Sequence, residues 1–540
     1  MNWLKKHPIF LLCIFTALML LPNLDVLNVS IMEARNFITA REMITDGHWL
    51  LTTMNGEARY QKPPLPTWIT AISSMLFGIK SVFGLRLPTV LMVMLTGTYI
   101  YKLSFEILKN STHSFFNALI VVTSFYVIGI TIEAPWDIFS HSFMLIAIFY
   151  LFKLFQKKIP SWKDGILAGI FIGFSFMSKG PISIYALLLP FLISYGFTFK
   201  YKSLNKKTPL YLAIILISLG IGGWWFIYVR LHDPLTFQII TQKETANWSN
   251  YNVKPFYYYW SFFSQSGIWT IPAFISLLFP YLKDRVRNKK GYLFSLLWTI
   301  FAVILLSIIP EKKARYLMPV LIPLAINIGF YIDYLIRNFN YLNNKKETIP
   351  VYINFGLIAL IGVLFPFFGY FFLRTSPPNS WVPFIIASFI LFIIGILIIY
   401  YLIKKNIKFV FLLTIAFFAS ILITGLPIYQ SIPNTTYKPV SNEITNQVKT
   451  YTIGSIAPEI IWQFDDKLLP LKSKKNSFIY PNEEIFGVLT NAKELKKEKQ
   501  LNSRYKIKIV STFNLNLVQP NSKKYKDRLV YNFYLLEKKM

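Results

Sequence analysis

Long apolar runs recur along this chain and restrict it to one class of fold. A helix of roughly 18–25 apolar residues crosses the ~30 Å hydrocarbon core of a bilayer, because its backbone groups bond within the segment. We count about 13 such runs, near residues 8–25, 84–104, 114–131, 137–156, 164–178, 181–199, 209–229, 268–282, 291–309, 315–336, 350–373, 382–403 and 407–429. The sequence therefore predicts a mainly α, polytopic membrane protein.

The first run predicts a retained helix. The opening "MNWLKKH" is typical of a signal peptide, but no small-residue cleavage site follows it. Cys13, the single cysteine of the chain, lies in this run, so no intramolecular disulfide is expected.

The formal charge of +31 is explained largely by membrane topology. Basic residues cluster in short loops on one side of the predicted spans, which the positive-inside rule makes cytoplasmic. They are Lys5, Lys6, Lys153, Lys157, Lys158, Lys163, Lys200, Lys202, Lys206, Lys207, Lys283, Arg285, Arg287, Lys289, Lys290, Lys404, Lys405 and Lys408. The N-terminus is then cytoplasmic, the first loop (about 25–80) and the C-terminal part lie outside, and a nucleic-acid partner is not expected.

The hydrophobic runs stop near residue 431. Beyond it, "RYKIKIVSTF" and "RLVYNFYLLEKK" alternate as strands do, and "NAKELKKEKQLN" has a helical pattern. We predict a transmembrane domain over residues 1–430 and a small extracytoplasmic α/β domain over residues 431–540.

Charged side chains gather at the outer ends of the predicted spans. Besides the first loop, three short turns carry them: "IEAPWD", "MSKGP" and "PEKKARYLMPVLIP". In a helix bundle these turns border one cavity, whose Lys and Arg suit an anionic substrate such as a phosphate. A carboxylate nearby would serve as general base or would stabilise positive charge on a sugar carbon.

Each of these residues also has a purely structural interpretation. Ser30 and Glu33 form an S-x-x-E capping box ahead of an amphipathic pattern. Asp137 suits the N-cap of the following span, and Lys179 and Arg315 suit ordinary interfacial anchors. The "KPPLP" stretch is also typical of a rigid turn.

The first loop resembles a known family. "EARNFITAREMITDGHWLLTTMNGEARYQKPPLPTW" is similar to the first outer loop of class C glycosyltransferases related to 4-amino-4-deoxy-L-arabinose lipid A transferase and protein O-mannosyltransferases. "APWDIFS", "MSKGP", "KPFYYYW" and "RYLMPVLIP" extend the likeness. The resemblance implies an inverting transfer of a sugar from an undecaprenyl-phosphate carrier to lipid A or another envelope acceptor. The reaction would occur at the periplasmic face of a bacterial cytoplasmic membrane.

The resemblance and the charge pattern together give the predicted site. Glu33 and Asp137 are the catalytic candidates. The candidates for binding substrate or phosphate are Arg35, Arg59, Tyr60, Lys62, Lys179, Lys312, Lys313, Arg315 and Tyr316.

Two positions depart from the family pattern. Met32 stands where the family commonly has its first Asp, and Gln61 replaces the acidic residue before Lys-Pro-Pro. Met32 cannot accept a proton, so Glu33 or Asp137 takes over, or the acceptor is already nucleophilic, or activity is lost. A neutral amide is a poor ligand for a divalent ion, which weakens the case for a metal at this position. We assign no metal ligand and no certain cofactor, and metal dependence stays open.

Other functions stay open at this point. The alternatives are a flippase for lipid-linked glycans, a protein O-mannosyltransferase-like enzyme, and a non-catalytic lipid-binding relative. Transporters usually place ionisable groups near the bilayer midplane within internal repeats, whereas here the charges lie at one face. The expected partners are a lipid-linked sugar donor, a lipid or glycan acceptor and membrane lipids, with the sugar and the acceptor unidentified.

Overall fold

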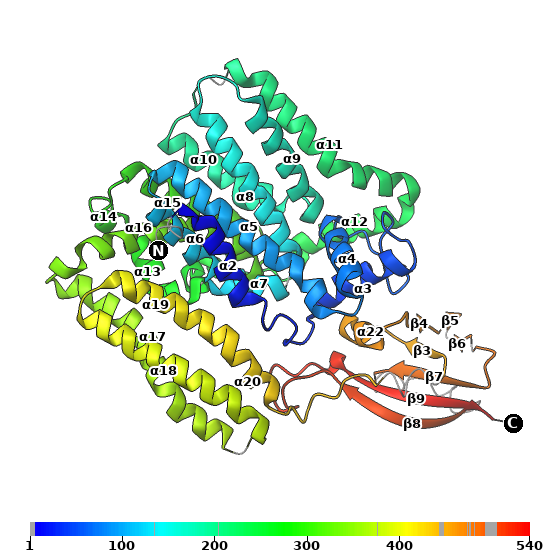
Figure 1. The fold of residues 1–540 in the computed structure, drawn as a ribbon. Coiled ribbons are helices and arrows are strands. Elements are labelled where there is room, and N and C mark those ends of the chain that lie inside the picture. Colours follow the sequence, from blue (N-terminus) through cyan, green and yellow to red (C-terminus); the bar gives the residue numbers. More distant parts are fainter. Residues whose placement is uncertain are drawn as a thin grey trace.

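The computed structural model describes residues 6–133, 135–202, 205–374, 376–441, 448–471, 473–474, 477–479, 481–491 and 505–539. A body of packed helices holds most of the chain, and a small β-sheet from the C-terminal part lies along one edge of it (Figure 1). The mainly helical architecture with a small sheet domain confirms the predicted fold class.

Eight helical runs among the described residues are long and apolar enough to cross a membrane. They contain α5 (Val82–Leu108), α8 (Pro135–Gln156), α11 (Thr208–His232), α15 (Lys289–Ile308), α16 (Met318–Asn338), α17 (Lys345–Leu373), α18 (Trp381–Ile403) and α19 (Ile407–Ser420). Each one coincides with a predicted span.

Four of the other five predicted spans form shorter or interrupted helices, and the fifth, α9 (Trp162–Lys179), is a continuous helix of 18 residues that carries Lys163, Asp164 and Lys179. The count of 13 therefore stays a prediction. The five spans correspond to α2 (Pro8–Leu20), to α6 (Ser111–Val122) with α7 (Phe125–Glu133), to α9, to the π-turn η1 (Ile184–Leu188) with α10 (Leu189–Thr198), and to η4 (Phe262–Trp269) with α13 (Thr270–Ser276) and α14 (Phe279–Leu282). Single residues cause some of the breaks. Gly267 adopts φ 67° in the middle of η4, where a helix cannot continue.

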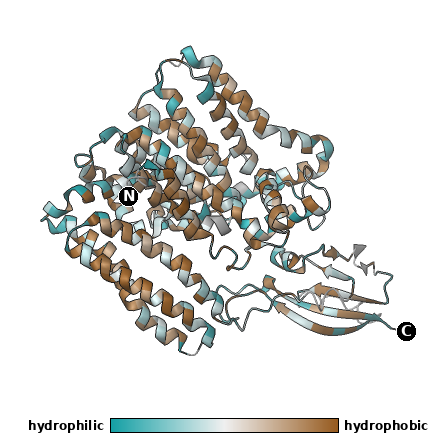
Figure 2. Ribbon diagram, in the orientation of Figure 1, coloured by the Kyte–Doolittle hydropathy of each residue, from teal (hydrophilic) through white to brown (hydrophobic). Residues whose placement is uncertain are grey.

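The helices divide into a buried set and an outward-facing set. In α8 and in the run that contains α16, 89% of the most apolar 18-residue window is buried inside the protein, against 22% in the runs of α11 and α17. Figure 2 shows the outer helices as strongly hydrophobic along their length. An apolar surface of this extent is typical of contact with lipid.

The first outer loop folds into two helices with a hairpin between them. Helix α3 (Ile31–Thr45) begins with the predicted capping box, since Ser30 Oγ accepts from the Glu33 amide and Glu33 accepts from the Ser30 amide. The strands β1 (Thr53–Met54) and β2 (Glu57–Ala58) pair as a hairpin, and α4 (Leu65–Phe77) follows the proline turn. Glu42 holds the hairpin turn by accepting from the Asn55 and Gly56 amides at 2.6 and 3.2 Å.

The C-terminal sheet has five strands in the order β4-β3-β7-β9-β8. They are β3 (Thr450–Ile453), β4 (Leu469–Pro470), β7 (Ile485–Thr490), β8 (Tyr505–Asn514) and β9 (Val530–Lys538). β3 is parallel to β4 and β7, and β9 is antiparallel to both of its neighbours. The two strands predicted from alternation are confirmed as β8 and β9, while most of the predicted helix "NAKELKKEKQLN" lies outside the described residues.

The sheet domain docks on α3 through its helix α22 (Pro458–Phe464) (Figure 1). Ile38 of α3 belongs to the apolar core that includes Ile460 and Ile461 of α22. Asn55 and Leu468 exchange two hydrogen bonds, of 2.7 and 2.8 Å, across the same boundary. The C-terminal domain is therefore tied to the first outer loop, which is far from it in sequence.

Candidate active site

A buried ion pair marks one end of the helix bundle. Asp137 lies in the first turn of α8 and Lys179 is the last residue of α9, and the Lys179 ammonium donates to the Asp137 carboxylate. Both side chains are almost completely buried. Because α8 begins at Pro135, Asp137 lies inside the helix and not at its N-cap. Charged groups at such a depth are costly and are typical of functional sites in membrane proteins.

Further cations surround this pair. Lys62 and Arg315 are within electrostatic range of Lys179. The ring of Tyr316 links three of the positive groups, with its centre 5.1 Å from Lys179 Nζ, 5.6 Å from Lys313 Nζ and 5.8 Å from Arg315 Cζ. We call Lys62, Lys179 and Arg315 the cation cluster.

Two buried N–H donors at the site have no hydrogen-bond partner among the described residues. They are Nε of Arg315, in the 3₁₀ turn η5 (Ala314–Leu317), and Nε1 of Trp136. A buried donor without an acceptor costs about 1–3 kcal/mol. An anionic ligand would supply the missing acceptors.

Lys62 is held only loosely. It lies before the proline turn that leads into α4, and its Nζ is 3.5 Å from Glu244 Oε2 of α12 (Pro234–Asn250). The two side chains are 29% and 37% exposed, and pairs of this kind contribute little to stability. A ligand phosphate could therefore take Lys62 from Glu244 at small cost.

A small cavity adjoins Lys62 and Trp136. Its lining comes from the first outer loop, from α4 and from the start of α8. The lining residues are Thr39, Thr52, Arg59, Lys62, Pro64, Thr67 and Trp136. The sequence prediction placed Lys62 and Arg59 at one site, and here they share one cavity.

Arg59 connects residues on two sides of this cavity. Its guanidinium donates to the backbone carbonyl of Arg35 and to Thr39 Oγ1 at 2.9 Å, and it lies 5.1 Å from the centre of the Trp136 ring. Burial, with Arg35 nearby, lowers the pKa of Arg59 to about 9. The guanidinium thus fixes α3 against the start of α8.

Arg35 faces the C-terminal domain. Glu459 and Arg528 of that domain and Arg315 of the helical body are all within its electrostatic range, and burial lowers the pKa of Arg35. Its guanidinium makes one long contact, 3.9 Å from Nη1 to the sulfur of Met32. Arg35 therefore lies where the cation cluster approaches the docked domain.

Three predicted site residues are already engaged by the protein itself. Lys312 is buried and donates to the carbonyls of Lys254 and Ile309 at 3.1 and 2.6 Å. Lys313 pairs with Glu311. Tyr60 donates to Asp233 at 3.0 Å, and burial together with this bond raises the pKa of Tyr60 to about 12.

Glu33 has both carboxylate oxygens occupied. Arg86 donates to them at 2.7 and 3.1 Å, and the Ser30 amide donates at 2.9 Å. Glu33 and Arg86 are each 1% exposed. This predicted catalytic residue therefore ties the start of α3 to α5.

Sequence reasoning did not single out Trp136, Glu244 or Arg86. Arg86 had a detectable signal, because an arginine inside an apolar run requires an acidic partner. Trp136 adjoins Asp137 in the quoted turn, but nothing in the sequence indicates an unsatisfied N–H. Glu244 lies in a polar stretch with no pattern that connects it to Lys62.

One grouping of potential metal ligands occurs within the described ranges: Glu42, Asp46 and His48. Each of the three side chains already has a polar partner within the protein. Glu42 binds the hairpin turn, Asp46 pairs with Lys467 at 2.8 Å, and His48 Nδ1 lies 2.8 Å from Thr53 Oγ1. The group joins the first loop to the C-terminal domain.

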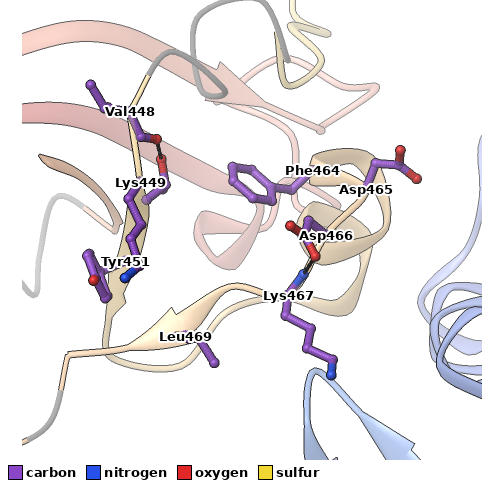
Figure 3. Close-up of a pocket in the computed structure, with 9 residues that line it drawn as sticks. Val448, Lys449, Tyr451, Phe464, Asp465, Asp466, Lys467 and Leu469 are labelled. Atoms are coloured by element: carbon purple, nitrogen blue, oxygen red, sulfur yellow. Dashed lines mark hydrogen bonds between the residues drawn. The ribbon is translucent and has the colours of Figure 1, made fainter. Parts of the chain in front are cut away.

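A second hollow lies in the C-terminal domain, between α22 and the strands β3 and β4 (Figure 3). The charged residues on its rim are bound elsewhere. Asp465 pairs with Arg41 and Lys80 of the first loop region, and Lys449 pairs with Glu483 at 2.9 Å. The two pairs of Asp465 join the domain to the first loop region, and the pair of Lys449 lies within the domain. The cation cluster is therefore the stronger candidate for an active site.

Fold and site together define a class: a polytopic helical protein with cations gathered around a buried carboxylate at one end of the bundle. Residues 61–225, which include Lys62, Asp137 and Lys179, match the family model of dolichyl-phosphate-mannose-protein mannosyltransferases. The crystal structure of ArnT from Cupriavidus metallidurans bound to undecaprenyl phosphate has the same fold. Its TM-score is 0.70 at 15% identity, over 97% of each chain.

The similar proteins include several arabinosyl transferases. The chain is 29% identical over 349 residues to undecaprenyl phosphate-alpha-4-amino-4-deoxy-L-arabinose arabinosyl transferase 1 of Proteus mirabilis, covering 62% of this chain and 61% of the relative. It is 28% identical over 360 residues to the arabinosyl transferase of Edwardsiella ictaluri, with the same coverage. The match spans about three fifths of these relatives. The comparisons confirm the resemblance predicted from the first outer loop.

Proposed function

We propose that this chain is an integral-membrane glycosyltransferase that moves a sugar from an undecaprenyl-phosphate carrier to an acceptor of the cell envelope. The observation that carries the proposal is the cation cluster around Asp137, with the unpartnered Nε of Arg315 beside it. Lys and Arg bind phosphate oxygens through strong, charge-assisted hydrogen bonds. The named substrates of the similar transferases agree with this chemistry.

In the proposed reaction, an acceptor oxygen attacks the anomeric carbon from the face opposite the phosphate. The bond between that carbon and the phosphate oxygen breaks, and its electron pair leaves with the carrier phosphate, so the configuration inverts. Lys62, Lys179 and Arg315 stabilise the charge that develops on the leaving group. Fixed charges of this kind are typically among the largest contributions to catalysis.

Lys179 would be shared between Asp137 and the leaving phosphate. When the phosphate takes up part of the ammonium's hydrogen bonding, the Asp137 carboxylate becomes available to accept the acceptor's proton. Arg35 and Tyr316 border the same region, while Lys313 offers a further cation. We leave Lys312 out of the phosphate site because its ammonium already binds two carbonyls.

For Glu33 we propose a positioning role. Its oxygens accept hydrogen bonds from Arg86 and from the Ser30 amide at the N-cap of α3. Asp137 is then the carboxylate that remains for proton transfer, and Met32 needs no catalytic function.

The proposal includes the membrane orientation. The basic loops support a cytoplasmic N-terminus, and 13 spans would then put the site and the C-terminal domain on the periplasmic side. Donor and acceptor would then meet at the outer membrane interface, where no nucleotide sugar is required. Lipid A phosphate and an envelope glycan are the acceptors proposed.

The test is carrier release by the purified protein in nanodiscs. A panel of undecaprenyl-phosphate sugars is incubated with the protein, and free undecaprenyl phosphate is measured by mass spectrometry. Release that falls at least a hundredfold in Lys179→Ala, and that is weakened in Lys62→Ala, supports the proposal. Saturable carrier binding without release over the whole panel would contradict the transferase and favour a flippase or a binding protein.

A further inference from the structure

A buried polar network lies one helical turn below the Asp137–Lys179 pair. His141 Nδ1 and Ser183 Oγ are 2.8 Å apart, and Ser183 Oγ is 2.7 Å from Ser140 Oγ. Ser140 and Ser175 bind each other's backbone carbonyls through their hydroxyls at 3.1 and 2.8 Å. We call Ser140, His141, Ser175 and Ser183 the serine–histidine network; each member is at most 1% exposed.

The spacing of the network follows that of the ion pair. His141 lies four residues after Asp137 on α8, and Ser175 lies four residues before Lys179 on α9. Ser183 follows the end of α9 and joins the two helices through its hydrogen bonds with His141 and Ser140. Residues four apart on a helix lie on the same face, one turn from each other. The network therefore joins the segments that carry the two charged residues, directly beneath them.

Lys179 is the last residue of α9, and the chain reverses immediately after it, so no further helical turn fixes its position. Gly180 adopts φ 74° and ψ −153°, a conformation that ends α9 and that other residues rarely adopt. Pro181 follows, and η1 begins at Ile184 with a π-turn. A π-turn is less regular than an α-helix and often occurs at functional sites. Ser183, between the reversal and η1, is the point at which the network holds this segment.

We propose that His141 and Ser183 are positioning residues for the transfer reaction. They hold the reversal after Lys179 against α8, so that the ammonium stays within reach of both Asp137 and the carrier phosphate. This inference rests on the proposed function, and it adds residues that need not touch the substrate. A displacement of about 1 Å in a catalytic group is sufficient to reduce a rate by up to about a hundredfold.

The network must be distinguished from ordinary polar packing between helices. Ser142 provides the matched control, because it lies on α8 next to His141, is also buried, and bonds to Thr96 Oγ1 at 2.7 Å and to the Met92 carbonyl at 3.1 Å. Those partners belong to α5, so these bonds involve neither α9 nor the segment that follows Lys179. If buried hydroxyls matter only for packing, Ser142→Ala and Ser183→Ala should behave alike.

The experiment compares His141→Leu, His141→Asn, Ser183→Ala and Ser142→Ala in nanodiscs. Three quantities are measured: the apparent Tm, the Kd for undecaprenyl phosphate alone, and kcat and KM for carrier release. We expect His141→Leu and Ser183→Ala to lose about tenfold or more in kcat or in carrier affinity. Asn offers a polar atom close to the position of Nδ1, so His141→Asn should recover most of the loss, and Ser142→Ala should stay within about twofold of the native protein.

The outcomes separate this inference from the function it rests on. If the native protein releases carrier while His141→Leu and Ser183→Ala keep their kcat, KM and Kd, the positioning role is wrong and the transferase stands. If no donor is turned over, the proposed function fails, and the binding measurements still decide whether the network orients Lys179 toward a phosphate. Equal losses in Ser142→Ala and Ser183→Ala, following Tm, would overturn the inference in favour of packing.

Discussion

The Glu33–Arg86 pair provides the sharpest test of a structural against a catalytic role. Arg86 donates to both Glu33 oxygens, at 2.7 and 3.1 Å, and also to the Leu24 carbonyl at 2.8 Å. Replacing Glu33 by Leu leaves a buried guanidinium with only neutral acceptors. Breaking one side of a buried pair costs about 3–5 kcal/mol, whereas replacing both partners by apolar residues is often nearly neutral.

The assay is a double-mutant cycle with Glu33→Leu, Arg86→Met and the combined variant. Apparent unfolding midpoints are followed by tryptophan fluorescence in one detergent, and carrier release is measured on the same preparations. Each single variant should lower the midpoint more than the combined variant does, because only the single variants leave an unpaired charge. The combined variant should keep carrier release within about tenfold of the native rate.

Two results would refute this reasoning. Additive losses of stability would show that the two groups are not coupled. A combined variant with a native midpoint and no carrier release would show that Glu33 has a catalytic role.

Three further predictions follow from the same structure. Lys179→Arg should retain measurable carrier release, unlike Lys179→Ala, because charge near the leaving phosphate is the required property; equal loss in both variants, measured by mass spectrometry, would contradict this. Glu244→Gln should tighten undecaprenyl-phosphate binding by up to about fivefold, since an exposed pair with Lys62 contributes about 1 kcal/mol or less; a titration showing weaker binding would exclude competition for Lys62. Asp465→Asn should destabilise the docked C-terminal domain by about 1–3 kcal/mol, because it removes the carboxylate facing the mostly buried Arg41; faster limited proteolysis of that domain is the readout, and unchanged proteolysis would show that apolar contacts suffice.

Local patterns in the sequence predicted the elements that depend on local physics. The capping box of Ser30 and Glu33 follows from a four-residue motif, the strands β8 and β9 follow from alternation, and eight of the spans follow from continuous apolar runs. The reversal at Gly180 and the kink at Gly267 were not predictable in detail, because one backbone conformation decides each of them.

The sequence indicated where the site residues lie, but it did not indicate which partners their side chains bind. The sequence indicated that Lys62, Asp137 and Lys179 lie at one end of the bundle, and the structure places them there. It did not indicate that Lys312 turns its ammonium onto backbone carbonyls, since a lysine in a short turn has the same surroundings in sequence whichever way it points. The choice of partner depends on tertiary packing, and the functional roles of these residues stay predictions.

The docking of α22 on α3 has a consequence for how the protein is made. Asn55 and Leu468, which bond across that boundary, are 413 residues apart in the chain. At a synthesis rate of about 5–20 residues per second, roughly 20–80 s separate their emergence from the ribosome. During this interval Ile38 lacks the apolar cover that α22 later supplies. A chain that stalls in its last helices would therefore display an incomplete first loop, a signal by which quality-control proteases could recognise unfinished molecules.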